Sequence, residues 1–95
     1  SLNQLINFVC ENPVKIFGIK NKGYIREGFD ADFTIVDMDK KIIIKNENIE
    51  SKCKWSPFNG FEFSGTPVAT IIDGKIKMKQ GKIIGGAEGK PLEFN

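Results

Sequence analysis

The stretch that decides the fold is Gly28-Phe29-Asp30-Ala31-Asp32-Phe33-Thr34-Ile35-Val36-Asp37. Its aspartates form either a metal or acid–base site, or the start of a strand. A metal site needs further oxygen or nitrogen ligands, and Ile35 and Val36 occupy the positions where a calcium loop would carry them. In the other interpretation Gly28 makes a turn, Asp30 bonds the turn amides and Asp32 begins the strand. The residue types favour this second interpretation.

After this stretch the chain alternates between apolar runs and turn residues. Residues 33–36 and 41–45 are apolar on both faces, which is typical of strands that lie between other layers. Asp37-Met38-Asp39-Lys40 predicts a turn between them. A short strand follows at 61–63, and Gly65-Thr66-Pro67 predicts a break.

Asp73-Gly74 is a strong hairpin signal, because a type I′ turn needs positive φ at both positions. It separates residues 68–72 from residues 75–79, and Gln80-Gly81 predicts a further turn before a last short run. We therefore expect about six strands in a mostly antiparallel sheet, followed by a glycine-rich tail along the surface.

The N-terminal residues predict helices. Leu2, Leu5, Ile6 and Val9 form one apolar stripe at helical spacing, with Ser1 as a possible cap. Asn12-Pro13 predicts a second short helix with Asn12 as its cap, and Gly18 is placed to end it. A chain that begins with Ser1 rather than Met favours a cut, processed or engineered end.

Composition limits the function. The chain has 95 residues, 40% of them hydrophobic, which suits one soluble domain. A net charge of +2 is too small to argue for nucleic-acid binding, and no apolar run reaches the ~20 residues of a membrane span. Histidine is absent, so the usual zinc ligand and the usual base for a nucleophile are both missing. We expect Cys10 and Cys53 to be reduced and buried.

Two other groups of residues are candidate binding surfaces. Lys75, Lys77 and Lys79 alternate along one strand and could bind phosphates, but such a face also keeps a sheet edge soluble. Trp55-Ser56-Pro57-Phe58 could bind a peptide, but a tryptophan in such a loop more often anchors it to a core. Cys53 has no neighbouring His or Cys that would make it a nucleophile or ligand. No catalytic, cofactor-binding or metal residue is assigned.

The order of these segments resembles the C-terminal region of the amidohydrolase superfamily. The resemblance rests on Asn12-Pro13-Val14-Lys15-Ile16-Phe17-Gly18-Ile19, on Lys22-Gly23-Tyr24-Ile25, and on the stretch from Gly28 to Asp37. It implies the last helix of a metal-dependent barrel followed by part of a composite β-sandwich. The expected division is a helical segment at 1–23 and a sandwich portion at 24–95.

The later residues resemble the dihydroorotases of the long, multi-domain type. They are Ser51 to Gly60, Gly65-Thr66-Pro67-Val68, Asp73-Gly74 and the ending Gly89 to Asn95, with Val14 and Lys54 as departures from the usual Ala and Gly. Such enzymes are implied to be cytoplasmic zinc enzymes that reversibly close N-carbamoyl-aspartate to dihydroorotate in pyrimidine biosynthesis. Their metal and substrate residues lie on the barrel, and none maps onto this sequence.

The resemblance implies a non-catalytic portion of such an enzyme, inactive as this chain alone and without its own zinc. The expected partner is a barrel domain or a homologous chain, and the uncovered apolar residues should otherwise drive self-association. The alternative is a stand-alone binding or oligomerisation module derived from such an enzyme.

Overall fold

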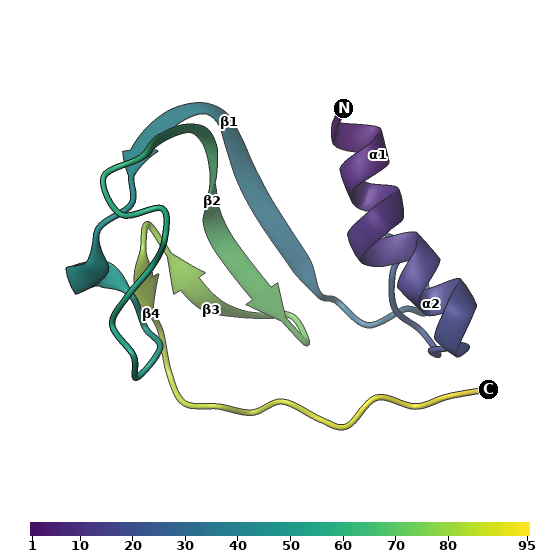
Figure 1. Cartoon of the computed structure of the whole chain (residues 1–95). Coiled ribbons are helices and arrows are strands. Elements are labelled where there is room, and N and C mark those ends of the chain that lie inside the picture. The colour runs from purple at the N-terminus through teal and green to yellow at the C-terminus, as the bar shows by residue number, and fades with distance from the viewer.

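The computed structural model describes all residues, 1–95. It contains an N-terminal helix, a four-stranded antiparallel sheet, and a C-terminal tail that runs back from the sheet to the helix (Figure 1). The expectation of a mainly β chain with a short N-terminal helical segment is confirmed. None of the helices is both long enough and apolar enough to cross a membrane.

The helix is continuous, although it changes its winding. It comprises α1 (Leu2–Ile6), a π-helical turn η1 (Asn7–Glu11) and α2 (Asn12–Phe17). Ser1 forms a capping box with Gln4 at the start, and Gly18 ends the helix in the left-handed conformation, as predicted.

The prediction that Asn12 caps a separate second helix is wrong. Asn12 has helical backbone angles (φ −64°, ψ −45°), and its amide donates to the carbonyl of Asn7, five residues back. In a regular α-helix the ring of Pro13 would collide with the carbonyl of Val9 and remove one hydrogen bond. The wider π turn just before Pro13 relieves that conflict without breaking the helix.

The sheet has the order β1-β2-β3-β4, and every pair is antiparallel. Its strands are β1 (Phe33–Ile43), β2 (Glu62–Ile72), β3 (Lys75–Lys79) and β4 (Lys82–Ile83). The predicted hairpin is confirmed, because Asp73 (φ 52°) and Gly74 (φ 77°) both have positive φ in a two-residue loop. A 3₁₀ turn, η2 (Asn46–Asn48), lies in the loop between β1 and β2.

The predicted chain reversal at Asp37–Lys40 is wrong, because β1 runs straight through it. The Asp37 carboxylate accepts the amides of Asp39 (3.0 Å) and Lys40 (3.2 Å), so the turn chemistry is present. It produces a bulge instead of a reversal, with residues 38–40 opposite Gly65. Likewise, β2 continues through Gly65-Thr66-Pro67, where a break was predicted. Four strands therefore form instead of about six.

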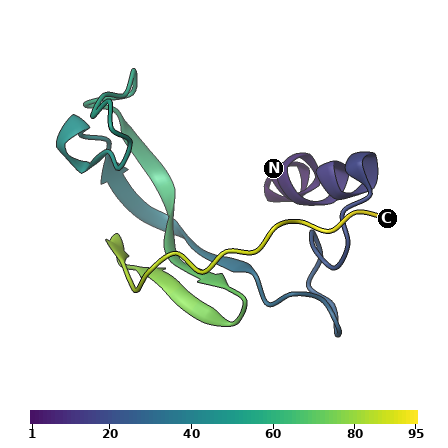
Figure 2. The ribbon, with the colours of Figure 1, turned by 90° about the horizontal axis from the view of Figure 1, so that it is seen from below.

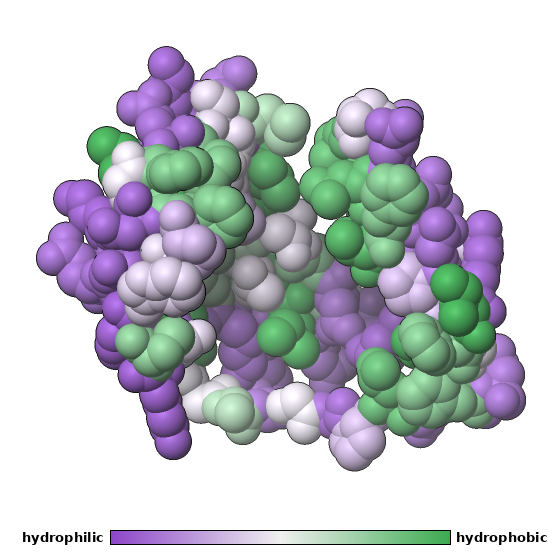
Figure 3. Space-filling model, in the orientation of Figure 1, coloured by the Kyte–Doolittle hydropathy of each residue, from purple (hydrophilic) through white to green (hydrophobic).

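The chain has almost no core. Thr66 is the one buried residue, at 8% exposure, and no hydrophobic residue is buried. The sheet is a single layer, so the second layer expected around its apolar strands does not come from these residues. The helical segments pack on one another and the strands pair with one another, but no helix Cα lies within 8 Å of a strand Cα. Apolar side chains line both sides of the hollow between helix and sheet (Figure 3).

Candidate functional site

The D-x-D motif lies in the linker that connects the helix to β1, beside the β2–β3 turn. Lys22 Nζ contacts Asp30 Oδ2 at 3.0 Å and Asp32 Oδ2 at 2.5 Å. The other oxygen of Asp32 accepts the amide of Asp73 at 2.8 Å. Next to this bond, the amide of Gly74 donates to the carbonyl of Ala31 at 2.9 Å. We call this group, Lys22 with Asp30, Asp32 and the Asp73-Gly74 turn, the linker clasp.

The clasp corrects one role that the sequence suggested. Asp32 does stand immediately before β1, but it is Asp32 rather than Asp30 whose side chain bonds a turn amide. That turn is distant in sequence, at residues 73–74. Asp30 instead pairs with Lys22.

Electrostatics keeps both sides of the clasp charged. The hydrogen bond from Lys22, followed by the one from the Asp73 amide, lowers the pKa of Asp32. The bonds to Asp32 and then Asp30 raise the pKa of Lys22. A carboxylate that is paired and more acidic than usual is a poor general base at neutral pH. The clasp therefore suits a structural junction better than acid–base chemistry.

The clasp residues also do not fit a zinc site. The chain contains no histidine, and nowhere does it bring together three His, Cys, Asp or Glu side chains that could hold a metal ion. The carboxylates of Asp30 and Asp32 are already paired with the ammonium group of Lys22. Cys10 and Cys53 are free thiols, and the expectation that both are buried is wrong, because Cys10 is half-buried and Cys53 is exposed.

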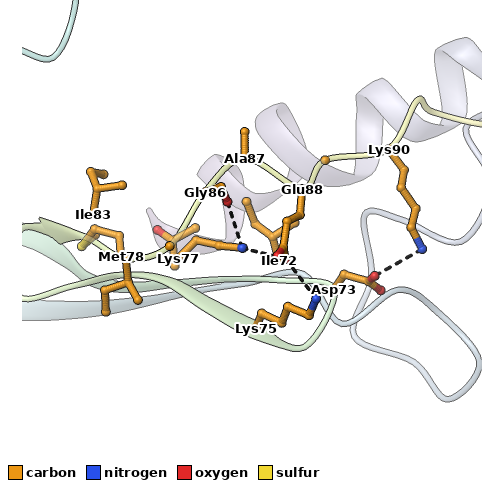
Figure 4. Close-up of a pocket in the computed structure, with 14 residues that line it drawn as sticks. Ile72, Asp73, Lys75, Lys77, Met78, Ile83, Gly86, Ala87, Glu88 and Lys90 are labelled. Carbon is orange, nitrogen blue, oxygen red and sulfur yellow. Dashed lines mark hydrogen bonds and ion pairs between the residues drawn. The ribbon is translucent and has the colours of Figure 1, made fainter.

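A cavity of about 770 Å³ lies between the β2–β3 hairpin and the tail (Figure 4). Lys75 and Lys77 of the predicted lysine face border it, but neither is free, whereas Lys79 is not among the lining residues. Glu88 Oε2 accepts from Lys75 Nζ at 2.9 Å and from Lys77 Nζ at 2.8 Å, and Lys77 also donates to the carbonyl of Gly86. Two of the three lysines on this strand face therefore bind the tail.

The tryptophan loop is organised by asparagines and not by its aromatic ring. Trp55 is 63% exposed, so the prediction that it anchors the loop onto a core is wrong for these residues. Asn59 Oδ1 accepts the amide of Asn46 at 2.8 Å, and Asn46 Oδ1 accepts the amide of Ser56 at 3.0 Å. Phe58 packs edge-on against the neighbouring ring of Phe61.

Sequence reasoning missed Lys22 and Glu88, the residues that join distant segments. Both lie in polar, glycine-containing segments where a charged residue is ordinarily solvated. For Asn46 and Asn59 a signal did exist, because asparagines near loop ends commonly bond backbone amides.

Comparisons with a family model, with similar sequences and with solved structures agree with one another. Residues 1–77 match the Amidohydrolase family. A dihydroorotase from Methanothermobacter thermautotrophicus is 40% identical over 86 residues, covering 90% of this chain and 20% of that protein. A dihydroorotase from Pyrococcus furiosus is 41% identical, covering 97% of this chain and 22% of that protein.

A solved L-hydantoinase (dihydropyrimidinase) from Arthrobacter aurescens superimposes with a TM-score of 0.84 at 35% identity. The match covers 88% of this chain and 19% of that one. The chain thus spans about a fifth of the length of the relatives it matches.

Proposed function

Because the chain belongs to the amidohydrolase family, we propose that it forms the C-terminal, non-catalytic portion of a dihydroorotase-like enzyme. In this proposal residues 1–23 provide the last helix of a catalytic barrel, and residues 24–95 provide part of a composite β-sandwich. The complete enzyme would be cytoplasmic and would interconvert N-carbamoyl-aspartate and dihydroorotate in pyrimidine biosynthesis.

The observation that carries the proposal is the identity of 40–41% to dihydroorotases over at least nine-tenths of this chain. The similarity to the solved hydantoinase is lower, at 35%. This difference favours the dihydroorotase branch over the hydantoinase branch of the same family. No observation favours the alternative of a stand-alone binding module.

Zinc, in this proposal, is held by another part of the enzyme. These residues do not fit the metal, since histidine is absent and the paired aspartates are engaged by Lys22. The chemistry is therefore assigned to a barrel, and the contribution of this chain is packing and positioning.

The bare apolar surfaces support a covering partner. The helix presents Leu5 (53% exposed) and Val9 (62% exposed), and β1 presents Ile35 (50% exposed). Single exposed apolar residues are ordinary, but a chain without any buried hydrophobic residue needs another surface to bury them. We propose that the barrel, or a homologous chain, provides that surface.

The test is the mass of the natural protein in its source cells, detected with an antibody raised against residues 1–95. We expect roughly four times the mass of this chain or more, because a catalytic barrel of about 250 residues accompanies it. That protein should also cyclise N-carbamoyl-aspartate after immunoprecipitation, and a chelator should abolish the activity. A mass equal to that of this chain, or a large protein without this activity, would overturn the proposal.

A further inference from the structure

Beyond the proposed function, the C-terminal tail holds the helix and the sheet together. The backbones of helix and sheet stay apart, with no helix Cα within 8 Å of a strand Cα, and the linker and the tail both run between the two parts. Figure 2 shows the tail crossing from the end of β4 to the end of α2. We call residues 85–95 the strap.

The strap is attached to the sheet by ion pairs. Glu88 lies between Lys75 and Lys77, and Lys90 Nζ lies 3.4 Å from Asp73 Oδ2 (Figure 4). Lys77 is the most covered of these groups, with 16% of its side chain exposed, and it also bonds the carbonyl of Gly86. The bonds from Lys77 and Lys75 lower the pKa of Glu88 to about 2, so the carboxylate stays ionised at any physiological pH.

The far end of the strap is attached by backbone bonds to residues 18–20, which directly follow the helix. The amide of Lys20 donates to the carbonyl of Glu93 at 2.8 Å, and the amide of Asn95 donates to the carbonyl of Gly18 at 2.7 Å. These two bonds form an isolated antiparallel bridge between Ile19 and Phe94. Two backbone bonds alone make a weak attachment, because a lone pair of short strands is at best marginally stable in water.

We propose that the strap is an ionic latch: Glu88, held by Lys75 and Lys77, places residues 93–95 where they pair with residues 18–20 and so fix the end of the helix relative to the sheet. Fixing Glu88 shortens the free segment that must close onto the helix, which lowers the entropic cost of forming the distant bridge. Ionic strength, and not pH, controls the latch, because exposed ion pairs are screened by salt while Glu88 remains charged.

Hydrogen–deuterium exchange of the intact natural protein tests the latch, read on peptides that contain the Lys20 and Asn95 amides. We expect Glu88→Gln to speed exchange in both peptides by about two- to fivefold, the range that exposed ion pairs support. The matched control is Glu62→Gln, on β2, where the side chain has no ion-pair partner and exchange should not change.

Salt gives a second readout that needs no variant. In 1 M NaCl the unmodified protein should exchange at these two amides as fast as Glu88→Gln does at low salt. Unchanged exchange of both peptides, in the Glu88→Gln variant or at high salt, would overturn the proposal. An equal rise over β1 and β2 would also overturn it, because Glu88 would then stabilise the whole chain and not the strap.

Discussion

At the scale of single residues, Asp32 connects two segments that are distant in sequence. One carboxylate oxygen accepts from Lys22 and the other accepts from the Asp73 amide, so one side chain joins the linker to the hairpin turn. Its position directly before a strand follows from the sequence. Its two partners do not, because they lie 10 and 41 residues away.

We predict that Asp32→Asn lowers the free energy of unfolding by about 0.5–1 kcal/mol at pH 7, a value kept small because the pair is partly exposed. The pKa of Asp32 is lowered from its ordinary value of 3.8 in the folded chain. Its contribution is therefore complete above that value and is lost as the pH falls through the lowered folded-state pKa. Lys22 behaves oppositely, and its contribution is lost only as the pH rises above 10.5.

Urea unfolding of wild type and Asp32→Asn at pH 7 and pH 2.5 measures this difference. The gap between the two proteins should narrow at the lower pH. Asp30→Asn is the control, and it should cost less because Asp30 is more exposed and bonds only Lys22. An equal loss for both variants, or a gap that widens in acid, would show that the clasp does not act as described.

At the scale of elements, a helix-breaking or turn-forming residue does not by itself end a helix or a strand. Pro13 changes the winding of the helix without ending it, and Asp37 produces a bulge without reversing the chain. In both cases the residue has its expected local effect. Continuation of the helix or strand is decided by the next residues along and by the pairing partner, which a local signal does not contain.

The linker also packs closely against the helix at one point, Gly23. A Cβ added there would lie 2.5 Å from Val14 Cγ2 and 2.9 Å from the carbonyl oxygen of Cys10, at a φ of +89°. Gly28 has nearly the same φ, +86°, but nothing lies within 4 Å of its added Cβ. Comparing substitutions at these two glycines therefore distinguishes the cost of backbone strain from the cost of steric overlap.

We predict that Gly28→Ala costs about 1 kcal/mol of unfolding free energy from strain alone. Gly23→Ala should cost about 1–3 kcal/mol more, because the methyl group also collides with the helix. Denaturant unfolding of both variants provides the measurement. If the two substitutions cost the same, the linker does not pack on the helix at the boundary between η1 and α2.

At the scale of the whole molecule, many large hydrophobic residues are exposed and none is buried. We predict that the isolated chain self-associates and binds a hydrophobic dye, because no layer covers its helix or its sheet. Leu5→Glu/Val9→Glu should shift it toward monomer with little effect on the helix, since both side chains are exposed. Sedimentation and dye fluorescence give the readout, with Asn3→Glu on the same helix as control. A dye-silent monomer would contradict this expectation.

The sequence by itself determined the local features: the cap at Ser1, the end of the helix at Gly18, the Asp73-Gly74 hairpin and the strand that follows Asp32. These depend on interactions within a few residues, which the residue types specify directly. The absence of histidine, likewise a property of the sequence, removed the usual zinc ligand.

Only the tertiary structure decided which charged residues form ion pairs and which apolar faces stay exposed. Lys22 pairs with Asp32, and Glu88 with Lys75 and Lys77, because two turns and the returning tail bring separate segments side by side. The sequence around a lysine in a polar segment does not indicate which distant carboxylate it will pair with. Strands apolar on both faces predict covering layers, but whether a chain provides those layers itself depends on how its segments are arranged in space. Here no helix Cα lies within 8 Å of a strand Cα, and the apolar side chains of both the helix and the sheet stay exposed.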